Sequence, residues 1–500
     1  MMLQSLVRAA ASLAVVSSVV HAAPAPSSNS QPAEKVVPFK PSTQDKLEAM
    51  KRWQAQVAST ADNVASKYPV DHIDDTPGYS LWDQFQDTGS LHKKPEPVNG
   101  KTGSKVYGPT NPQLDRQNPD TFAPPGTDHG TVPQSKWPFS LSHNRLQNGG
   151  WARQQNVDVL PVATDLAGVQ MHLDYGALRE LHWHTASEWA FVLNGTFRFS
   201  ILDAEGRNSV GDLGPGDLWF APSGLPHSIQ STSEGGGEFL LVFDDGSFSE
   251  DETFLLTDFM AHVPREVVLK NFPGFNDSDF NDLPTDELYI FPNQTSIQSL
   301  DEEFVSSPQG KAPVAYTYNA SSKPSVELPG GSVKIIDSRN FSISDIAMAD
   351  VTVNPGAMRE LHWHPNSDEW SYFLSGHARI TVWAGTTNAR TFDFSAGDVA
   401  YIPKSQGHFI EALGNTTVRY LELFKAPQYE DVSLSNWLSL MPPHVVQDHL
   451  GFSDAAMKKL QNFRSHDNQV VQGQNDGSGN GIGKRGVSDA PLYGGKQLWA

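Results

Sequence analysis

Short runs of alternating apolar and polar residues recur along the middle of this 500-residue chain, and turn-forming residues separate them. Val169–Leu173, Thr196–Leu202 and Glu238–Phe243 are examples, and in such a run every second side chain faces the same side of the strand. A Gly-Pro-Gly sequence at 214–216 is one of the turn signals between them. Several short strands at close spacing are typical of an antiparallel sandwich or barrel, so we predict an all-β core.

The pattern occurs twice. The hexapeptide Arg-Glu-Leu-His-Trp-His occupies 179–184 and returns at 359–364, 180 positions later, and a Gly-Ala pair stands before each copy. A repeat of this length predicts two tandem domains, with a few peripheral helices outside the repeated part. We predict a signal peptide at 1–22, a leader and extended N-terminal arm at 23–136, a first domain at 137–305, a second domain at 306–455 and a flexible tail at 456–500.

The N-terminus has the features of a secretory signal peptide. Arg8 precedes an apolar run from Ala9 to Val20 that is too short to span a bilayer, and small residues follow at 21–23. We therefore expect a secreted protein, with a disordered or organelle-targeting leader as the alternative. Asn-x-Ser/Thr sites, which fit a glycosylated secreted chain, occur at Asn194, Asn276, Asn293, Asn319, Asn340 and Asn415.

The balance of charge restricts the possible partners. Lys and Arg number 36 against 57 Asp and Glu, which gives a formal net charge of −21 at pH 7. A chain this acidic does not attract nucleic acid or an anionic membrane through its overall field, so we expect neither partner. It also repels small anions, so a bound anion must be captured by local cations or a metal ion. The absence of cysteine excludes disulfides and thiolate metal sites.

Each copy of the repeat carries three histidines and one glutamate with metal-ligand chemistry. The two sets are His182, His184, Glu188 and His227 in the first copy, and His362, His364, Glu369 and His408 in the second. Residues i and i+2 of a strand share a face, so paired histidines can both face a barrel interior. One His-x-His pair is more often an ordinary strand feature, but four matched residues in two copies favour a metal site. Such a set favours a six-coordinate divalent ion with two open positions over a closed zinc site.

These spacings resemble the two motifs of the cupin family, and two copies in one chain resemble a bicupin. Further stretches are similar to the oxalate decarboxylases of that family: Trp137–Arg145, Gly149–Arg153, Gly216–Gln230, Phe239–Glu250 and Tyr429–Leu438. The resemblance covers roughly residues 80 to 455. It implies two tandem cupin barrels (double-stranded β-helix or jelly roll) and one Mn²⁺ in each. The implied reaction converts oxalate to formate and carbon dioxide, with dioxygen as a catalytic co-substrate.

The resemblance also implies roles for single residues, beginning with the two sets of four as metal ligands. Arg179 and Arg359 lie three positions before the paired histidines, so we expect each guanidinium at its pocket edge, neutralising bound oxalate. Glu250, in the acidic stretch 249–252, matches the lid glutamate that delivers a proton to carbon. The second barrel has no such lid segment. There Glu422 matches the second-site glutamate, and it is either a catalytic acid or a buried structural carboxylate.

Alternatives to a decarboxylase remain. One is an oxalate oxidase that forms carbon dioxide and hydrogen peroxide, because loss of the lid acid leaves oxidation of the intermediate. In the bacterial pattern Asn and Ser follow the lid glutamate, whereas Asp251 and Glu252 stand here and add negative charge to the lid. Another is a storage or binding bicupin, although such proteins usually lose metal ligands. Family habit suggests a homo-oligomer, a trimer or hexamer, but the extended N-terminal arm could instead cap a monomer.

Overall fold

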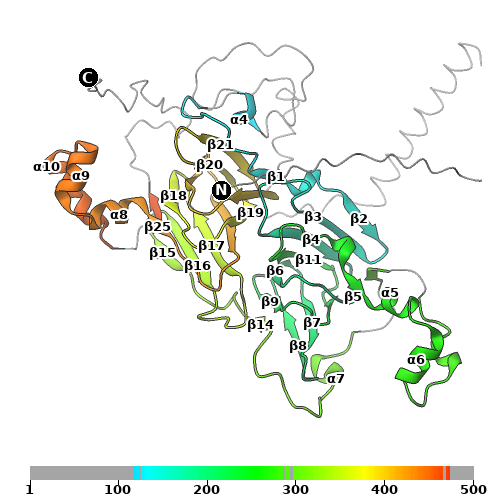
Figure 1. Ribbon diagram of the computed structural model, residues 1–500. Coiled ribbons are helices and arrows are strands. Elements are labelled where there is room, and N and C mark those ends of the chain that lie inside the picture. The colour runs from blue at the N-terminus through cyan, green and yellow to red at the C-terminus, as the bar shows by residue number, and fades with distance from the viewer. Residues whose placement is uncertain (1–117, 123–124, 285–287, 293–296, 466–468, 473–500) are drawn as a thin grey trace, which may run out of the picture. The chain divides into compact units, whose positions relative to one another are not determined.

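The structure of the protein is a computed structural model, and it describes residues 118–122, 125–284, 288–292, 297–465 and 469–472 (Figure 1). The predicted signal peptide, the leader as far as residue 117, Asn293 and the part of the tail after residue 472 lie outside these residues. Within the described ranges, no helix is long and apolar enough to cross a membrane.

Two sets of strands follow one another along the chain. The first set is β2 (Asn144–Gln147), β3 (Gly150–Gln155), β4 (Ala167–Leu173), β5 (Leu178–Trp183), β6 (Glu188–Asn194), β7 (Phe197–Leu202), β8 (Asn208–Leu213), β9 (Leu218–Ala221), β10 (His227–Ser231), β11 (Gly237–Phe243), β12 (Phe254–Leu255), β13 (Ile290–Phe291) and β14 (Thr317–Tyr318). The second set is β15 (Val326–Leu328), β16 (Gly331–Ile336), β17 (Ala347–Val353), β18 (Ala357–Trp363), β19 (Glu369–Ser375), β20 (His377–Trp383), β21 (Ala389–Ser395), β22 (Asp398–Ile402), β23 (Gly407–Ala412), β24 (Val418–Phe424), β25 (Val432–Ser433) and β26 (Val470–Gln472), and it is joined by β1 (Lys136–Pro138) from the N-terminal arm.

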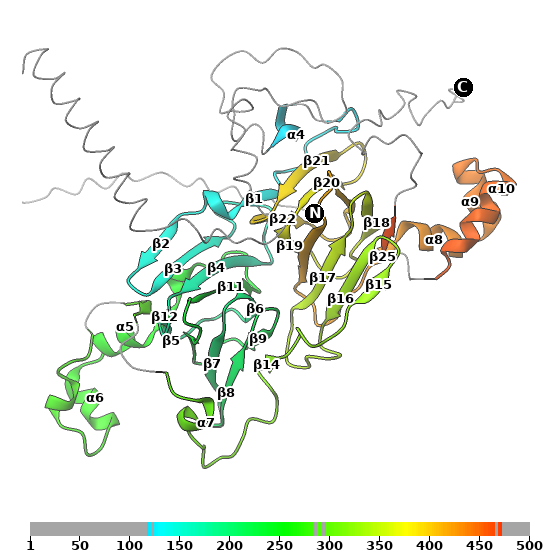
Figure 2. The ribbon, with the colours of Figure 1, turned by 180° about the vertical axis from the view of Figure 1, so that it is seen from behind.

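Each set folds into a barrel of two antiparallel sheets (Figures 1 and 2). In the first barrel the strand orders are β14-β9-β6-β11-β4-β3-β2 and β12-β5-β10-β7-β8, with β13 beside β5. In the second they are β1-β22-β19-β24-β17-β16-β15 and β21-β20-β23-β18-β25, with β26 beside β18. The two barrels use the same order of equivalent strands, which confirms the predicted all-β class and the duplication.

Each barrel has its own apolar interior, which includes Phe199 in the first and Phe373 in the second. A third apolar cluster contains Trp189 from the first barrel together with Trp370 and Leu423 from the second. The strands that carry it are covered on both faces, so β9 is buried at every position instead of alternating. The two sheets therefore form one continuous core between the barrels.

Three strands pair outside the predicted domain limits. β1 pairs with β22 of the second barrel before the chain enters the first. β14 lies beyond the predicted boundary at 305 and 306, yet it pairs with β9 of the first barrel. β26 lies within the stretch that we predicted as a flexible tail, and it pairs with β18. Each barrel is thus completed by strands from the connecting segments.

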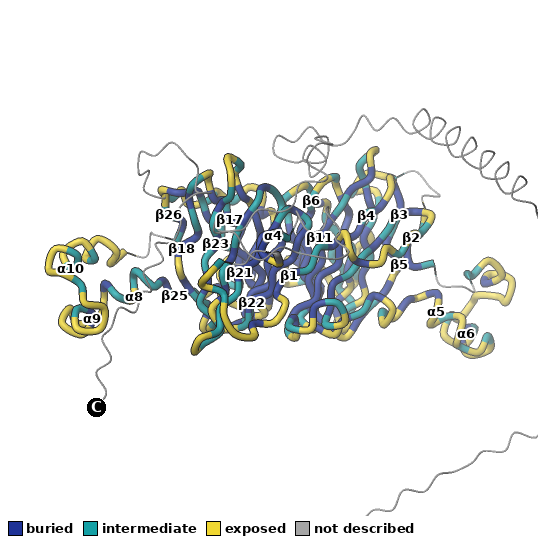
Figure 3. The backbone as a smooth tube through the Cα atoms, turned by 90° about the horizontal axis from the view of Figure 1, so that it is seen from above, coloured by how far each residue is buried: buried dark blue, intermediate teal, exposed yellow. Residues whose placement is uncertain are grey.

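The helices lie outside the barrels, as predicted. They are α4 (Pro119–Phe122), α5 (Leu256–Ala261), α6 (Arg265–Asn271), α7 (Leu300–Glu303), α8 (Leu434–Leu440), α9 (Pro443–Leu450) and α10 (Asp454–Leu460). Figure 3 shows that α6, α9 and α10 are largely exposed, whereas the strands of both barrels are mostly buried. The apolar clusters therefore come from the strands and from the segments between them, not from these helices.

The N-terminal arm is anchored on the second barrel by buried polar contacts. Lys136 Nζ donates to the carbonyl oxygen of Asp393 at 2.6 Å and lies 3.2 Å from Asp398 Oδ2. The main-chain N–H of Asp393 donates to Asp120 Oδ1 at 3.3 Å. Burial, reinforced by the charge of Asp393 and opposed by Lys136, raises the pKa of Asp120 from 3.8 to about 6. At neutral pH the ionised form of Asp120 therefore destabilises this part of the folded structure.

We predict that Asp120→Asn stabilises the protein near neutral pH but not in acid. A folded-state pKa above the unfolded value means that the carboxyl contributes stability below the unfolded pKa, and that this is lost as the pH rises through about 6. The asparagine cannot ionise, yet it keeps an oxygen for the Asp393 N–H. Its free energy of unfolding should exceed that of wild type by up to about 3 kcal/mol at about pH 7.5 and by almost nothing at about pH 4. Urea denaturation at both pH values measures this, and a less stable variant at the higher pH would contradict it.

Candidate metal centres

Strand pairing in the first barrel brings four potential metal ligands together. His182 on β5 and His227, the first residue of β10, are direct partners in the pairing of these strands. His184 follows β5, and Glu188 begins β6. All four side chains are buried and their ligand atoms lie within 4.8 Å of one another. Glu188 Oε2 is 3.2 Å from His184 Nε2 and 3.5 Å from His227 Nε2.

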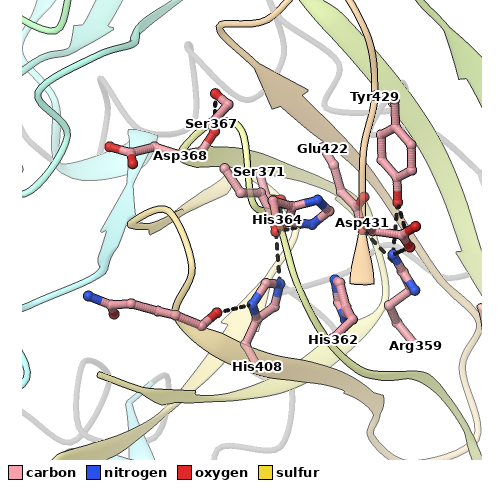
Figure 4. Close-up of polar contacts among 12 residues, drawn as sticks. Arg359, His362, His364, Ser367, Asp368, Ser371, His408, Glu422, Tyr429 and Asp431 are labelled. Carbon is pink, nitrogen blue, oxygen red and sulfur yellow. Dashed lines mark hydrogen bonds and ion pairs between the residues drawn. The ribbon is translucent and has the colours of Figure 1, made fainter. Parts of the chain in front are cut away.

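The second barrel repeats this arrangement with His362, His364, Glu369 and His408. His362 and His408 are partners in the pairing of β18 with β23. Glu369 Oε2 lies 3.3 Å from His364 Nε2 and 2.9 Å from His408 Nε2. Figure 4 shows the three histidines converging. The eight residues singled out in the sequence thus form two groups of the same composition.

In both centres the hydrogen bonds of the histidines leave Nε2 for a metal ion. Each of the six Nδ1 atoms lies 2.6–3.0 Å from a main-chain carbonyl oxygen, and a neutral ring that donates at Nδ1 carries its lone pair at Nε2. Although buried, Nε2 of His227, His362, His364 and His408 and Oε2 of Glu369 have no hydrogen-bond partner in the part of the chain that the structure describes. A divalent cation would satisfy these atoms, and imidazole with carboxylate suits Mn²⁺.

The second oxygen of each glutamate is held differently in the two centres. Glu188 Oε1 accepts from the indole Nε1 of Trp219 at 2.7 Å, whereas Glu369 Oε1 accepts from the hydroxyl of Ser371 at 2.6 Å. Burial by itself raises the pKa of each carboxyl, yet the neighbouring histidines bring both pKa values well below the ordinary one. Both glutamates therefore stay ionised, as metal ligands must be.

Beside the first centre, a buried arginine holds the lid glutamate. Arg179 Nη2 donates to Glu250 Oε2 at 3.2 Å, and the hydroxyl of Tyr289 donates to the same oxygen. The Arg179 guanidinium lies 3.9 Å from the centre of the Tyr289 ring. Glu250 begins a short 3₁₀ helix, Glu250–Glu252, and its N–H donates to Gln154 Oε1 at 2.9 Å. The structure thus brings Arg179 and Glu250 together and adds Tyr289 to them.

The extra negative charge on the lid has a cationic partner. Asp251 Oδ1 lies 3.3 Å from Arg145 Nη1, although Asp251 is 80% exposed, which makes this a weak pair. The Arg145 guanidinium also lies 3.8 Å from the centre of the Tyr289 ring. Two guanidiniums this close to one ring centre must occupy its opposite faces, so Tyr289 is held between Arg145 and Arg179.

Beside the second centre, Arg359 has different partners. Its Nη2 donates to Asp431 Oδ2 at 2.7 Å and to the hydroxyl of Tyr429 at 2.8 Å (Figure 4). Glu422 is fully buried on β24, where it accepts from Tyr420 at 2.9 Å and lies 3.7 Å from Arg359 Nε. Burial, with the charge of nearby Glu369, raises the pKa of Glu422. Asp431, not Glu422, is therefore the carboxylate that engages this arginine most closely.

The segments that follow the two barrels explain this difference. Residues 244–253 join β11 to β12, and residues 425–431 join β24 to β25 at the matching place. We predicted no lid segment beside the second barrel, and the structure corrects this in part, because a segment is present but is three positions shorter. It supplies Tyr429 and Asp431 directly, whereas the first centre takes its acid from the longer segment and its tyrosine from residue 289.

Sequence reasoning missed three of these residues. Tyr289 lies outside the repeat, and its φ of 56° is a left-handed conformation that non-glycine residues rarely adopt. No sequence pattern signals it. Tyr429 and Asp431 did have a signal, because both belong to the stretch Tyr429–Leu438 that carries the family resemblance.

Two jelly-roll barrels with a three-histidine, one-glutamate centre in each define a two-domain cupin metalloprotein. The chain matches the Cupin family over residues 140–273 and 318–458. It is 50% identical over 370 residues to oxalate decarboxylase OxdC of Bacillus subtilis (strain 168), covering 73% of this chain and 95% of that protein. It is 42% identical over 363 residues to a probable oxalate decarboxylase of Arthroderma benhamiae, covering 71% and 88%.

Solved structures agree with these relatives. A structure of Bacillus subtilis oxalate decarboxylase, described by its Mn(II) centres, matches with a TM-score of 0.73 and 49% identity, covering 76% of this chain and all of that one. A structure of the same enzyme at pH 4.6 matches with a TM-score of 0.72 and 49% identity, over 76% of this chain and 98% of that one. This chain therefore belongs to the bicupin oxalate decarboxylases of the cupin superfamily, as the sequence motifs predicted.

We predict that Trp219→Phe weakens metal binding at the first centre and leaves the second unchanged. The substitution removes the donor that orients Glu188, and loss of such a supporting hydrogen bond typically costs about 10–100-fold in metal affinity. Ser371→Ala is the matched control, because it removes the corresponding donor to Glu369 and should weaken the second centre alone. Manganese retained against a graded chelator, followed by elemental analysis and electron paramagnetic resonance, measures both. Equal loss from both centres in either variant would refute the assignment.

Proposed function

We propose that the protein decarboxylates oxalate at the centre formed by His182, His184, Glu188 and His227, with Glu250 as the general acid. The observation that carries this assignment is the buried contact of Glu250 with Arg179 next to those ligands. Mn²⁺ held there would bind oxalate and, with dioxygen as co-substrate, supply the one-electron chemistry that activates it. The reaction converts C₂O₄²⁻ and one proton to formate and carbon dioxide.

Arg179 supplies local positive charge for an anionic substrate. Its side chain is 2% exposed, and water screens a charge so placed very little. One oxalate carboxylate at this guanidinium would replace the bond that Glu250 now makes. This local capture offsets the repulsion expected from a net charge of −21.

We assign to Glu250 the transfer of the one proton that the reaction consumes. Cleavage of the carbon–carbon bond releases carbon dioxide, and the remaining one-carbon fragment needs a proton on carbon to become formate. A protonated Glu250 gives that proton, and the Arg179 and Tyr289 donors then stabilise its carboxylate. Phe248, stacked on Phe243 and edge-on to the His184 ring, shields the site from water on this side.

The other two functions are less well supported. An oxalate oxidase would not require an acid on the lid, and Glu250 is present and buried. A storage protein would not require two groups of converging ligands, five of which have a buried atom without a hydrogen-bond partner among the described residues. At the second centre Asp431, from the shorter segment 425–431, bonds Arg359 in place of a glutamate from a longer lid, and the buried Glu422 lies 3.7 Å from Arg359 Nε. We therefore assign the second centre a bound metal and the first centre the reaction.

We also propose that the protein forms a homo-oligomer, a trimer or a hexamer. Each barrel is followed by helices and connecting loops with exposed apolar side chains, including Phe259 and Phe275 after the first barrel and Trp437 and Leu440 after the second. Two such surfaces on one chain allow head-to-tail contacts that close into a ring. Light scattering after gel filtration should give a mass of three or six chains, and Phe259→Asp should lower it. A monomeric wild type would rule this out.

We predict that Glu250→Gln lowers formate production by at least about 100-fold, because a general acid typically contributes 10²–10⁴-fold. Hydrogen peroxide should appear instead, since an intermediate that is not protonated remains open to oxidation. Glu252→Gln is the matched control: it removes a charge from the same turn at an exposed position and should keep the wild-type products.

Formate and peroxide are followed together, with Mn-loaded protein and oxalate in mildly acidic buffer. Wild-type formate output from Glu250→Gln would refute the acid assignment. Stoichiometric peroxide from the wild type would refute the decarboxylase assignment itself.

A further inference from the structure

Glu180 is the neighbour of Arg179 on β5, and it has no role in the proposed decarboxylation of oxalate. The pairing of β5 with β10 is irregular between Arg179 and His182, and the Glu180 carboxylate contacts Thr257 and Tyr289, not a metal ligand. The Glu180 side chain is buried, with the residue only 2% exposed. A buried carboxylate is costly unless its oxygens are bonded, and the partners of Glu180 therefore show what it does.

The carboxylate of Glu180 joins two segments that are far apart in sequence. Oε1 accepts from the main-chain N–H of Thr257 at 2.8 Å and from the Thr257 hydroxyl. Oε2 accepts from the main-chain N–H of Tyr289 at 3.0 Å. Thr257 lies in the first turn of α5, directly after the lid segment 244–253 and β12. Glu180 thus ties the end of the lid and Tyr289 to the strand that carries Arg179.

The main chain of Tyr289 is held on both sides by this strand. Its carbonyl oxygen accepts from the N–H of Glu180 at 3.0 Å and from Arg179 Nη1 at 3.4 Å, while its N–H is bound by the Glu180 carboxylate. These bonds hold Tyr289 in its left-handed conformation, which tertiary contacts must impose on a non-glycine residue. In that conformation the phenol reaches Glu250.

In the second barrel, the glutamate at the equivalent position does not bind the main chain of a tyrosine. Glu360 has the same position in the repeat, and its Oε2 accepts from Ser435 at 2.8 Å. Its N–H donates to the carbonyl oxygen of Gln469, which takes the place of Tyr289. Among the residues that the structure describes, Glu360 Oε1 has no hydrogen-bond partner, and Gln469 carries no phenol for an acid. The tie through the carboxylate to a tyrosine main chain is thus found in the first barrel.

We propose that Glu180 is a positioning residue for the proton transfer, acting through Tyr289 and the end of the lid. This rests on the proposed decarboxylase function of the first centre. By fixing where Tyr289 and Thr257 lie, Glu180 sets how Glu250 meets the one-carbon fragment. It thereby controls the partition between formate, which needs the proton, and peroxide, which forms when the proton is not delivered.

Glu180→Gln tests this with little change in shape. The amide cannot accept through its NH₂ group, so one main-chain N–H, of Tyr289 or Thr257, would face a donor. We expect the ratio of peroxide to formate to rise about tenfold, in keeping with one buried donor left without a partner. Manganese content should stay at the wild-type level. Hydrogen exchange measured by mass spectrometry should speed up in peptides covering 249–257 and 288–291.

Glu360→Gln is the matched control, because it makes the same change in the same hexapeptide of the other barrel. It should leave the product ratio within about twofold of wild type, since the residue has no link to Glu250. If Glu180→Gln does not fold, Thr257→Val and its counterpart Ser435→Ala ask the same question through the hydroxyl alone, with a smaller rise expected for Thr257→Val only.

An unchanged ratio in Glu180→Gln, or an equal change in Glu360→Gln, would overturn the proposal and leave both glutamates as structural residues. A wild type that makes no formate would instead refute the proposed function, so the two failures are distinguishable.

Discussion

The hydrogen bonds from histidine Nδ1 atoms to main-chain carbonyls are the constraint on which both metal centres depend. They determine the tautomer, and they aim each Nε2 at a point that a buried carboxylate also faces. These carbonyls belong to the strands and turns themselves. The positions of the ligand atoms therefore depend on the registers of the β5–β10 and β18–β23 pairs. A shift by one residue would turn the histidines out of the barrel. The large apolar cores on both faces of the sheets hold these registers, and they therefore also hold the metal ligands in place.

The duplicated barrels are alike in their strands and different in what connects them. Ligands, arginines and the buried glutamates Glu180 and Glu360 recur at matching positions. The acid and the tyrosine that meet each arginine do not, because they come from the segments after the barrels. A loop can change length without disturbing a sheet, whereas a strand cannot. Two sites with the same metal ligands can therefore differ in function through a few residues outside the repeat.

This division also explains how much could be predicted from the sequence. Strand spacing signals the fold, and the two His-x-His pairs give four of the eight ligand positions, since period-two alternation is a local property. The other four follow from residues that recur at matching places in the two copies and from the resemblance to the cupin motifs. Tyr289 and the tie through Glu180 are not local. They depend on how the segment between the barrels returns to β5, which no repeat or motif records. The pairing of β1 and β14 with the opposite barrels escaped prediction for the same reason, because short edge strands carry little pattern of their own.

Electrostatics connects these observations. The overall charge of the chain opposes an anionic substrate, and the lid adds Asp251 and Glu252 to that charge. Each of two lid carboxylates has an arginine partner: Arg145 lies beside Asp251 at the exposed surface, and Arg179 lies beside Glu250 in the interior. Tyr289 lies between the two guanidiniums, so Arg145, which contacts the lid, and Arg179, at the anion site, both contact the same side chain. In the function that we propose, an oxalate that replaces Glu250 at Arg179 would alter the contacts of Tyr289 as well, which would couple substrate capture to the placement of the acid.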